Sequence, residues 1–189
     1  SIYSCGNIIK WLRDKMKFFN SAIESESFID KEGNSNNVLF LPAFNGLGAP
    51  FWDSDIRGGF YGITQDTTIT DMTTASFLAI AFQTKEITSI LEKYKIEISK
   101  LLVDGGMVQN NWLMQFISDV LNLPIYRPKV HETTALGAAL IAGYGIGIYK
   151  SLSYMSKKLK YDKKFYPKMA HKKRFKLLNG WSQAIRKSL

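Results

Sequence analysis

Two spacings of hydrophobic residues alternate along this chain. Short apolar runs bounded by glycine, proline or asparagine indicate buried strands. Runs of this kind predict strands at residues 1–4, 37–42, 58–63, 101–103 and 124–128. Apolar residues three and four positions apart predict helices at residues 7–19, 70–94, 110–121 and 133–144. Strands that alternate with helices are typical of an α/β domain, in which right-handed crossovers join paired parallel strands.

The strongest helical pattern covers residues 70–94, where no proline or glycine interrupts the apolar positions. Thr70 or Asp71 can cap the first turn. We expect one apolar side on this helix, made by Phe77, Ile80, Ala81, Ile87 and Leu91. Residues 24–36 are rich in serine, acidic residues, glycine and asparagine, and this composition predicts a loop or a frayed linker.

The connection at residues 42–53 has too many special residues for an ordinary loop. Its two glycines and two prolines restrict the backbone, and Phe44, Phe51 and Trp52 provide apolar anchors. Asp53, at its end, is a candidate general base, but fixing the loop is the more common role for an aspartate in this setting. We expect an ordered loop packed on its own aromatic residues.

The composition is that of a soluble protein. The chain has 189 residues, 46% of them hydrophobic, so one domain with an appendage is expected. No run approaches the roughly 20 apolar residues that span a bilayer, and the first residues lack the pattern of a signal peptide. A single cysteine, Cys5, is expected to be a packed thiol in a reducing, cytoplasmic setting. A strand that begins at residue 1 without methionine suggests that chain is missing upstream.

The formal net charge of +9 is concentrated near the C-terminal end. From residue 150 onward the chain has 13 basic residues and one acid, whereas residues 1–149 have 12 basic and 15 acidic residues. A basic tail favours contact with nucleic acid or an anionic membrane. Lysines interleaved with apolar residues such as Leu177, Leu178 and Trp181 are more typical of the solvated side of packed helices. We therefore expect a helical basic tail and no nucleic-acid partner.

Two strand-to-helix turns have the features of an anion-binding site. At residues 103–106 the sequence VDGG ends a strand, and its two glycines let the backbone approach a ligand beside the N–H groups of a starting helix. Gly6 opens the first helix in a similar way. Turns of this kind gather at one edge of an α/β sheet. The pattern is not a Walker loop, and two glycines after a strand more often only turn the chain.

The remaining polar candidates have structural explanations. Asn110 can cap the helix that follows it or hydrogen-bond to a nucleotide. The segment TTALGAA at residues 133–139 is a helix start in which threonine caps and small residues allow close packing. Asp104 is a possible base, but capping the turn is the more common role. His131 and His171 have no cysteine or carboxylate at ligand spacing, so no structural metal site is indicated.

A series of motifs runs from near the first residue to about residue 147. They are WLRD at 11–14, the loop at 42–53 with its GLGAPFWD, RGGFYG at 57–62, AFQT at 81–84, VDGG at 103–106, NN at 110–111, LMQF at 113–116, RP at 127–128 and TTALGAA at 133–139. Together and in this order they resemble the glycerol-kinase branch of the FGGY carbohydrate kinases. Related pentulose and hexulose kinases share DGG and TALGAA, so the preference for glycerol depends mainly on the GLGAPFWD loop.

The resemblance implies a fold and a parent reaction. The fold would be an actin/hexokinase-like (ribonuclease H-like) α/β ATPase lobe, with a mixed sheet flanked by helices. Residues 1–149 would form the nucleotide-binding C-terminal lobe, and residues 150–189 a basic extension packed on it. The parent reaction converts ATP and glycerol to ADP and glycerol 3-phosphate in a cleft between two lobes. This chain resembles only the C-terminal lobe.

The resemblance also places five residues at the nucleotide. Gly6 would lie against it, and Gly106 would present its backbone to it. Lys10 stands where the family usually has glutamine, and its cation could meet a phosphate. Asn110 would hydrogen-bond to the nucleotide, and Gly105 would support the same turn.

Other functions would belong to the N-terminal lobe. The family's catalytic aspartate and polyol-binding residues lie there, so we expect no catalytic residue in this chain and glycerol bound only through the other lobe. Magnesium would arrive with ATP, held mainly by the nucleotide and the other lobe. Leu78 stands where the family pattern has an acid, and we expect this change to alter packing or a contact behind the site.

Alternatives to a glycerol-kinase lobe stay open. One is a lobe of another FGGY sugar kinase, of the xylulokinase or gluconokinase type. Another is a non-catalytic module, either a degenerate nucleotide-binding domain or a basic interaction domain, which the departures at Lys10 and Leu78 favour. A lobe without its partner exposes the face that normally meets it, so we expect an apolar patch and possible homo-oligomers. We also expect weak ATP binding and no kinase activity from this chain alone.

Overall fold

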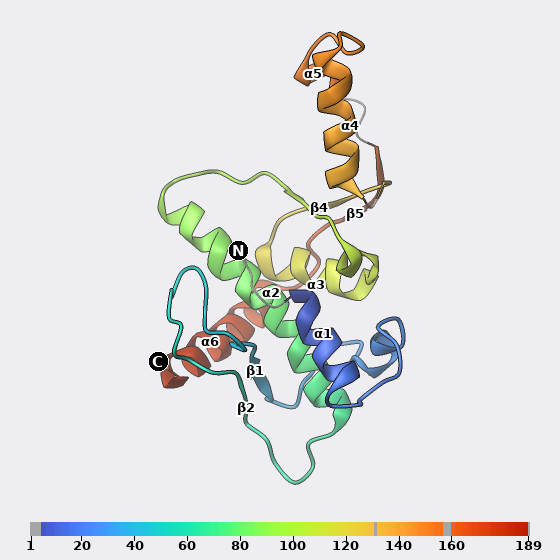
Figure 1. The fold of residues 1–189 in the computed structure, drawn as a ribbon. Helices are drawn as coiled ribbons and strands as arrows, with labels where there is room; N and C mark the ends of the chain where they lie inside the picture. Colours follow the sequence, from blue (N-terminus) through green and yellow to red (C-terminus); the bar gives the residue numbers. More distant parts are fainter. Residues whose placement is uncertain (1–4, 131, 157–159, 189) are drawn as a thin grey trace.

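The computed structural model describes residues 5–130, 132–156 and 160–188, so the strand predicted at 1–4 and the side chain of His131 lie outside the described residues. Helices and strands alternate through most of the chain, as predicted for an α/β protein (Figure 1). In order, the elements are α1 (Cys5–Asp14), η1 (Glu24–Phe28), β1 (Leu39–Leu41), β2 (Gly59–Tyr61), α2 (Ile69–Lys93), β3 (Leu101–Leu102), η2 (Gly106–Gln109), α3 (Asn111–Leu121), β4 (Ile125–Pro128), α4 (Thr133–Gly145), α5 (Leu152–Ser156), β5 (Tyr161–Phe165) and α6 (His171–Ser188).

Helix α2 runs through the middle of the molecule (Figure 1). Its cap is Thr68 rather than Thr70 or Asp71: the Thr68 side chain accepts a hydrogen bond from the Asp71 N–H, and the Asp71 carboxylate accepts one from the Thr68 N–H at 2.8 Å. This reciprocal pair is a capping box. The prediction of a single apolar side was wrong, because α1, α3 and β1 all pack against α2 and bury every residue from Thr73 to Phe82.

The strands form two small sheets. Strands β1 and β2 pair antiparallel, with Leu41 opposite Gly59. The second sheet has the order β3-β4-β5, in which β3 and β4 are parallel and β4 and β5 antiparallel. Helix α3 lies in the connection from β3 to β4, so the predicted crossover between parallel strands is present. The paired segments are shorter than the predicted strands.

The helix predicted at residues 7–19 is too long, because α1 ends at Asp14. Lys17 has a positive φ of 58°, which an α-helix does not allow, and the Phe18 N–H donates to the Leu12 carbonyl at 3.1 Å. This turn sends the side chain of Phe19 into the core, where it is 4% exposed. Burial of that ring replaces the further helical turn that the spacing indicated.

Residues 24–36 are attached to the core, so the prediction of a frayed linker was wrong. The Asp30 N–H donates to Thr74 Oγ1 at 2.9 Å, and Asn36 Nδ2 donates to Asp71 Oδ1 at 2.7 Å. Ile29 is buried. These contacts join the segment to the first turns of α2, which its polar composition concealed.

The loop at residues 42–53 is ordered by aromatic packing, with one exception. The ring of Phe44 lies 5.2 Å from that of Trp11, and Phe51 packs against the core. Trp52 is 71% exposed, so the prediction that it anchors the loop was wrong. Asp53 Oδ1 accepts a hydrogen bond from the Asp55 N–H at 2.8 Å, which confirms that its carboxylate fixes the loop.

Helix α4 projects away from the body of the molecule (Figure 1). The expectation of close packing was wrong: within the described part of α4 only Gly143 is buried, and Ile141 is 64% exposed. The predicted threonine cap was also wrong, because the N-cap is Glu132 and has no side-chain hydrogen bond. Thr133 Oγ1 instead donates to the carboxylate of Asp104, which joins α4 to the end of β3.

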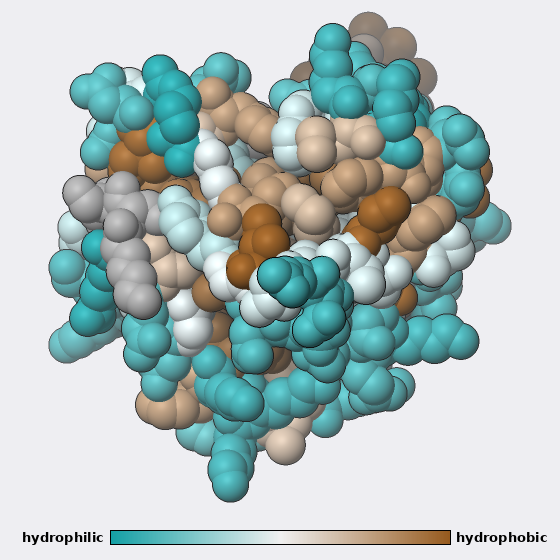
Figure 2. Space-filling view, turned by 90° about the horizontal axis from the view of Figure 1, so that it is seen from below, coloured by the Kyte–Doolittle hydropathy of each residue, from teal (hydrophilic) through white to brown (hydrophobic). Residues whose placement is uncertain are grey.

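The basic tail is integrated into the fold. Strand β5 completes the second sheet, and in α6 Trp181 is 1% exposed with its ring 5.4 Å from that of Phe82. Lys172 and Lys176 on the same helix are exposed, as expected for the solvated side of a packed helix. Figure 2 shows one face on which hydrophilic side chains surround a hollowed band of hydrophobic ones. Among the described helices, none is long and apolar enough to cross a membrane. The division at residues 149 and 150 stays a prediction.

Candidate functional site

A cavity of about 490 Å³ lies where α1, η1, α2 and η2 meet. Four of the five predicted nucleotide residues line it: Gly6, Lys10, Gly106 and Asn110. They come from the first helix and from a turn about a hundred positions later in the chain. Gly105 flanks this group without lining the cavity. The structure therefore brings the two glycine-containing turns together around one hollow.

The two neighbouring glycines differ in backbone and surroundings. A Cβ atom built on Gly6 or Gly106 would meet nothing within 4 Å, so neither backbone is covered by a side chain from elsewhere. Gly105 has φ 91° and ψ 176°, a conformation that is essentially confined to glycine. Its N–H donates to Asp104 Oδ1 at 2.7 Å, which confirms the turn-capping role of Asp104. Gly105 thus shapes the turn, and Gly106 faces the cavity.

Asn110 combines a structural role with a free donor group. Its Oδ1 accepts a hydrogen bond from the Leu113 N–H at 2.7 Å, which confirms that it caps α3. Its Nδ2 donates no hydrogen bond to any described residue. Because capping uses the oxygen and a ligand would use the nitrogen, the same side chain can do both.

Arg127 on β4 holds the glycine turn in place. Its Nη1 donates to the Val108 carbonyl at 2.9 Å and to Asn111 Oδ1 at 3.2 Å, at the end of the turn that Gly106 begins. Its Nε and Nη2 bind the carboxylate of Asp162 on β5. In the sequence this arginine stands out only as part of the motif at residues 127–128. Arg127 is a cation in an otherwise apolar strand, and Asp162 is the one acid in the basic tail. These two features together could have revealed the ion pair.

Two features of the cavity favour an anion, the Lys10 ammonium group and the N-terminal end of α1. Lys10 and Arg13 line it together with Glu26. Arg13 is paired with Asp14 at 2.6 Å, and this hydrogen bond lowers the pKa of the Asp14 carboxyl. Lys10 donates no hydrogen bond to a described residue, so its ammonium group is available to a ligand. The N-terminal end of α1, at Gly6, adds the partial positive charge of a helix start.

Apolar side chains form the rest of the wall. Ile9 and Phe77 are buried behind the cavity, and Met107 lies beside Gly106. Ile23, which immediately precedes the segment predicted as a linker, is 90% exposed at the cavity. An apolar wall with a few polar groups is the usual composition of a small-molecule site. These residues were not predicted from the sequence, although an isoleucine in a polar stretch was a possible signal.

Leu78 does not touch this cavity. Its neighbour Phe77 lines the cavity, whereas Leu78 lines a separate one beside Leu177 of α6. Leu78 is 2% exposed. Its apolar side chain therefore affects packing between α2 and α6, one of the two effects expected from the missing acid.

Two other candidates have no catalytic features. Burial raises the pKa of the Cys5 thiol from 9.0 to about 11, so the thiol is protonated at neutral pH, as expected for a packed cysteine. The ring of His171 stacks on Phe175 at 6.3 Å. In the described ranges, histidine, cysteine and acidic residues form no group of three or more that could hold a metal ion.

Comparison with known proteins identifies the family. Residues 1–146 match the FGGY family of carbohydrate kinases, C-terminal domain. The chain belongs to this family. It is 42% identical over 190 residues to a protein named glycerol kinase from Bacillus subtilis, and the match covers 100% of this chain and 38% of that relative. The chain therefore spans well under half the length of the FGGY kinases that it matches.

Solved FGGY kinases share the fold. The structure is similar to that of Plasmodium falciparum glycerol kinase with ADP, with a TM-score of 0.89, 38% identity, and coverage of 100% of this chain and 38% of that chain. It is also similar to a ligand-bound xylulose kinase from Lactobacillus acidophilus, with a TM-score of 0.78 and 24% identity over 97% of this chain and 38% of that one. The second likeness concerns the fold alone. These matches confirm the predicted actin/hexokinase-like lobe.

Proposed function

We propose that this chain is the nucleotide-binding lobe of a glycerol kinase and that it binds ATP or ADP in the cavity described above. The observation that carries the proposal is the convergence of Gly6, Lys10, Gly106 and Asn110 on one hollow. The 42% identity to a glycerol kinase and the likeness to a glycerol kinase crystallised with ADP support it.

Each residue has a chemical reason to be there. Gly6 and Gly106 expose backbone to phosphate oxygens, which need N–H donors at close range. The Lys10 ammonium would neutralise phosphate charge, and Asn110 Nδ2 would donate a hydrogen bond. Ile9 and Phe77 offer an apolar surface for the base. Gly105 would act through the shape of the turn and not through contact.

The complete reaction needs groups that this cavity lacks. Phosphoryl transfer requires a positioned hydroxyl, a metal ion and stabilisation of charge on the transferred phosphoryl group. Among the described residues, Glu26 is the one carboxylate that lines the cavity, so magnesium would be held mainly by the phosphates and by the rest of the kinase. Activation of glycerol would likewise fall to the rest of the kinase, in the cytoplasm. We assign no catalytic residue to this chain.

The preference for glycerol over a sugar depends on two features. The relatives at about 42% identity are named glycerol kinase, whereas the xylulose and gluconate kinases of Lactobacillus acidophilus share 24% identity and support the fold alone. The ordered GLGAPFWD loop also resembles glycerol kinases more than sugar kinases. Both features concern this lobe, so the substrate needs a direct test.

Calorimetric titration of the 189-residue chain with ATP tests whether the cavity binds the nucleotide. Asn110→Asp keeps the oxygen that caps α3 but removes the donor and adds a negative charge. We expect it to fold normally and to weaken ATP binding about tenfold or more, because a lost charge-assisted hydrogen bond has this effect. Asn179→Asp makes the same change on the exposed side of α6 and should leave the affinity unchanged. Equal ATP affinity in both variants would refute the assignment of Asn110.

Gly106→Val tests the backbone approach. No atom lies near a Cβ at this position, so the variant should fold, while its side chain would occupy the space of the ligand. Gly145→Val on exposed α4 is the matched control. Undiminished ATP binding by Gly106→Val would place the nucleotide elsewhere. Binding of an RNA oligomer with a steep salt dependence, and no ATP binding, would favour a basic interaction domain instead.

A reconstituted enzyme tests the substrate. The isolated chain should show no kinase activity, because one wall of the cleft is absent. Joined to the N-terminal lobe of a glycerol kinase, it should phosphorylate glycerol in preference to xylulose and gluconate. Turnover with a sugar only would reject the glycerol assignment and leave nucleotide binding intact. Turnover of glycerol by the chain alone would reject the division of roles between the lobes.

A further inference from the structure

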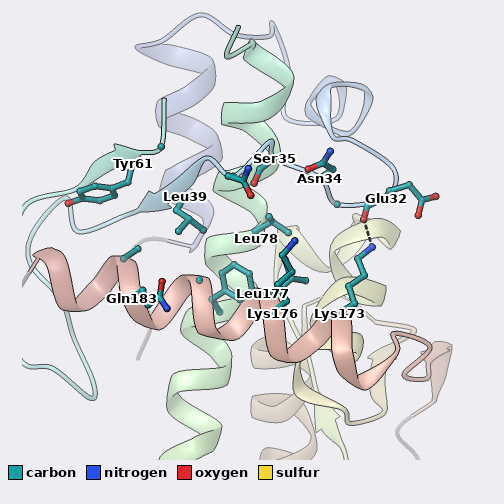
Figure 3. A pocket seen from close by; sticks show the side chains of 16 residues that line it. Glu32, Asn34, Ser35, Leu39, Tyr61, Leu78, Lys173, Lys176, Leu177 and Gln183 are labelled. Carbon is teal, nitrogen blue, oxygen red and sulfur yellow. Dashed lines mark hydrogen bonds between the residues drawn. The ribbon is translucent and has the colours of Figure 1, made fainter. Parts of the chain in front are cut away.

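A second cavity, of about 520 Å³, lies against a different face of α2 from the candidate nucleotide site. Three parts of the chain surround it: the segment at residues 32–37, strands β1 and β2, and one face of α6 (Figure 3). Lys173 Nζ donates to the Glu32 carbonyl at 2.8 Å, a bond that joins α6 to the segment at one end of the cavity. The volume is within the range of small-molecule sites, about 300–1,000 Å³.

The floor of this cavity is apolar. Phe82 and Leu78 of α2 line it and are 1% and 2% exposed. Leu39 of β1 and Leu177 of α6 lie beside Leu78 and complete the floor (Figure 3). At Gly180 a Cβ atom would meet nothing within 4 Å, so the missing side chain leaves the wall of the cavity open. Because the floor is apolar and the wall is open at Gly180, the cavity is better suited to a compact hydrophobic group than to water.

The rim carries a positive charge without a partner. Lys176 points from α6 toward Leu78 and the segment above it, and its ammonium group makes no hydrogen bond or ion pair with a described residue (Figure 3). The carboxylate of Glu32 points away from the middle of the cavity (Figure 3). Gln183, also on the rim, adds an amide with no hydrogen-bond partner in the described chain. The polar edge can therefore receive an anionic group and a hydrogen-bond acceptor.

We propose that this cavity binds a small molecule with one anionic head, a carboxylate or a phosphate monoester, on an apolar body. The body would lie on Leu78 and Phe82, and the head would meet Lys176. The site is independent of the nucleotide cavity, because consecutive residues of α2, Phe77 and Leu78, face different cavities. Saturating ATP should therefore not displace the ligand.

Calorimetry on the 189-residue chain, with ligand-observed NMR, tests the proposal with three probes of one shape. The probes are 4-phenylbutyrate, 4-phenylbutyl phosphate and the neutral 4-phenylbutanol. We expect saturable binding of at least one anion, with the alcohol about tenfold weaker because it lacks the charge. The two anionic probes distinguish a carboxylate from a phosphate ligand. Equal affinity for the alcohol and the anions, or no binding of either anion up to about 10 mM, would overturn the proposal.

Variants separate the contribution of the Lys176 charge to binding from that of the apolar cavity walls. Lys176→Gln should weaken binding of the anions about tenfold and leave the alcohol unaffected, whereas Lys172→Gln, on the same helix but away from the cavity, should change neither. Gly180→Leu fills the open wall and favours helix, so it should fold and abolish binding of every probe. Unchanged anion affinity in Lys176→Gln or Gly180→Leu would refute the site. Lys176 makes no contact that the fold needs, so its variant stays informative if Gly180→Leu misfolds.

Discussion

Gly105 and Gly106 are adjacent and yet serve different purposes. Gly105 has a backbone conformation that other residues adopt only with strain, whereas Gly106 has no positive φ and an open side toward the cavity. The motif alone does not distinguish them, because both read as flexible positions after a strand. Substitutions at the two positions distinguish a glycine needed for the backbone conformation from a glycine needed for ligand binding.

Gly105→Ala should lower the free energy of unfolding by about 1–3 kcal/mol, since alanine is forced into a region that is almost exclusive to glycine. Gly106→Ala should change it by less than about 0.5 kcal/mol, because its Cβ meets no atom and its backbone is unstrained. Urea unfolding followed by circular dichroism measures both. Equal loss of stability in the two variants would contradict the assigned backbone roles.

Cys5 provides a pH-dependent signal at the start of α1. Its pKa is raised from 9.0 to about 11 by burial, so the folded protein holds the proton more tightly than the unfolded chain does. The resulting stabilisation is complete below pH 9 and is lost as pH rises from about 9 toward about 11. At about pH 8 the folded protein should react with a disulfide reagent roughly 100-fold more slowly than the guanidinium-unfolded chain. Similar rates in the two states would show an accessible, ordinary thiol.

Strand β4 connects the sheet to the candidate site through one side chain. Arg127 is 8% exposed and reaches Asp162 on β5 in one direction and the Val108 carbonyl in η2 in the other. A buried cation of this kind is tolerated only when its N–H groups are bonded. The stability of β4, β5 and the glycine turn is therefore coupled.

Arg127→Met should destabilise the protein by about 1–3 kcal/mol, because it removes the hydrogen bonds that support the turn and the partner of the Asp162 carboxylate. ATP binding should fall together with stability, since Gly106 begins that turn. Arg57→Met is the control: Arg57 is exposed and donates only to carbonyls of its own loop, so the expected effect is below about 0.5 kcal/mol. Urea unfolding and ATP titration measure both effects. A small effect at Arg127 would show that the sheet does not support the turn.

Several exposed apolar side chains lie on α4 and just after it. Residues 133–148 contain no charged side chain, and Ile141, Ile146 and Ile148 are each more than 60% exposed. Apolar side chains of this kind were expected on the face of the lobe that meets its partner, and which face that is stays a prediction. Patches of this kind mark interaction surfaces in soluble proteins.

We expect the isolated chain to self-associate through this surface, with an apparent mass that increases with concentration in light scattering. Ile141→Lys together with Ile146→Lys should shift the equilibrium toward the monomer without loss of fold, because both side chains are exposed. Ile63→Lys places the same charge on a 55% exposed isoleucine elsewhere and should have no such effect. A monomeric wild-type chain at all concentrations would contradict this prediction.

Local features of the fold were predictable because they depend on neighbouring residues. The helix predicted at residues 70–94, the asparagine cap at Asn110 and the aspartate turn at Asp104 are all favoured by interactions within a few positions, and the structure has them. The end of α1 at Asp14 was not predictable, since the pattern to Phe19 fits a helix equally well. What stops the helix is burial of Phe19 in a core built by distant segments.

The amino-acid order was sufficient for the α/β class, for the resemblance to a kinase lobe and for the residues to examine. Only packing in three dimensions could show that residues 73–82 of α2 are buried on every side, that α4 is not, and that the segment at residues 24–36 closes a cavity. The physical reason is the distance along the sequence over which each interaction acts. Propensity, capping and turn chemistry act over a few residues, whereas burial and the convergence of Gly6 with Gly106 depend on neighbours about a hundred positions apart.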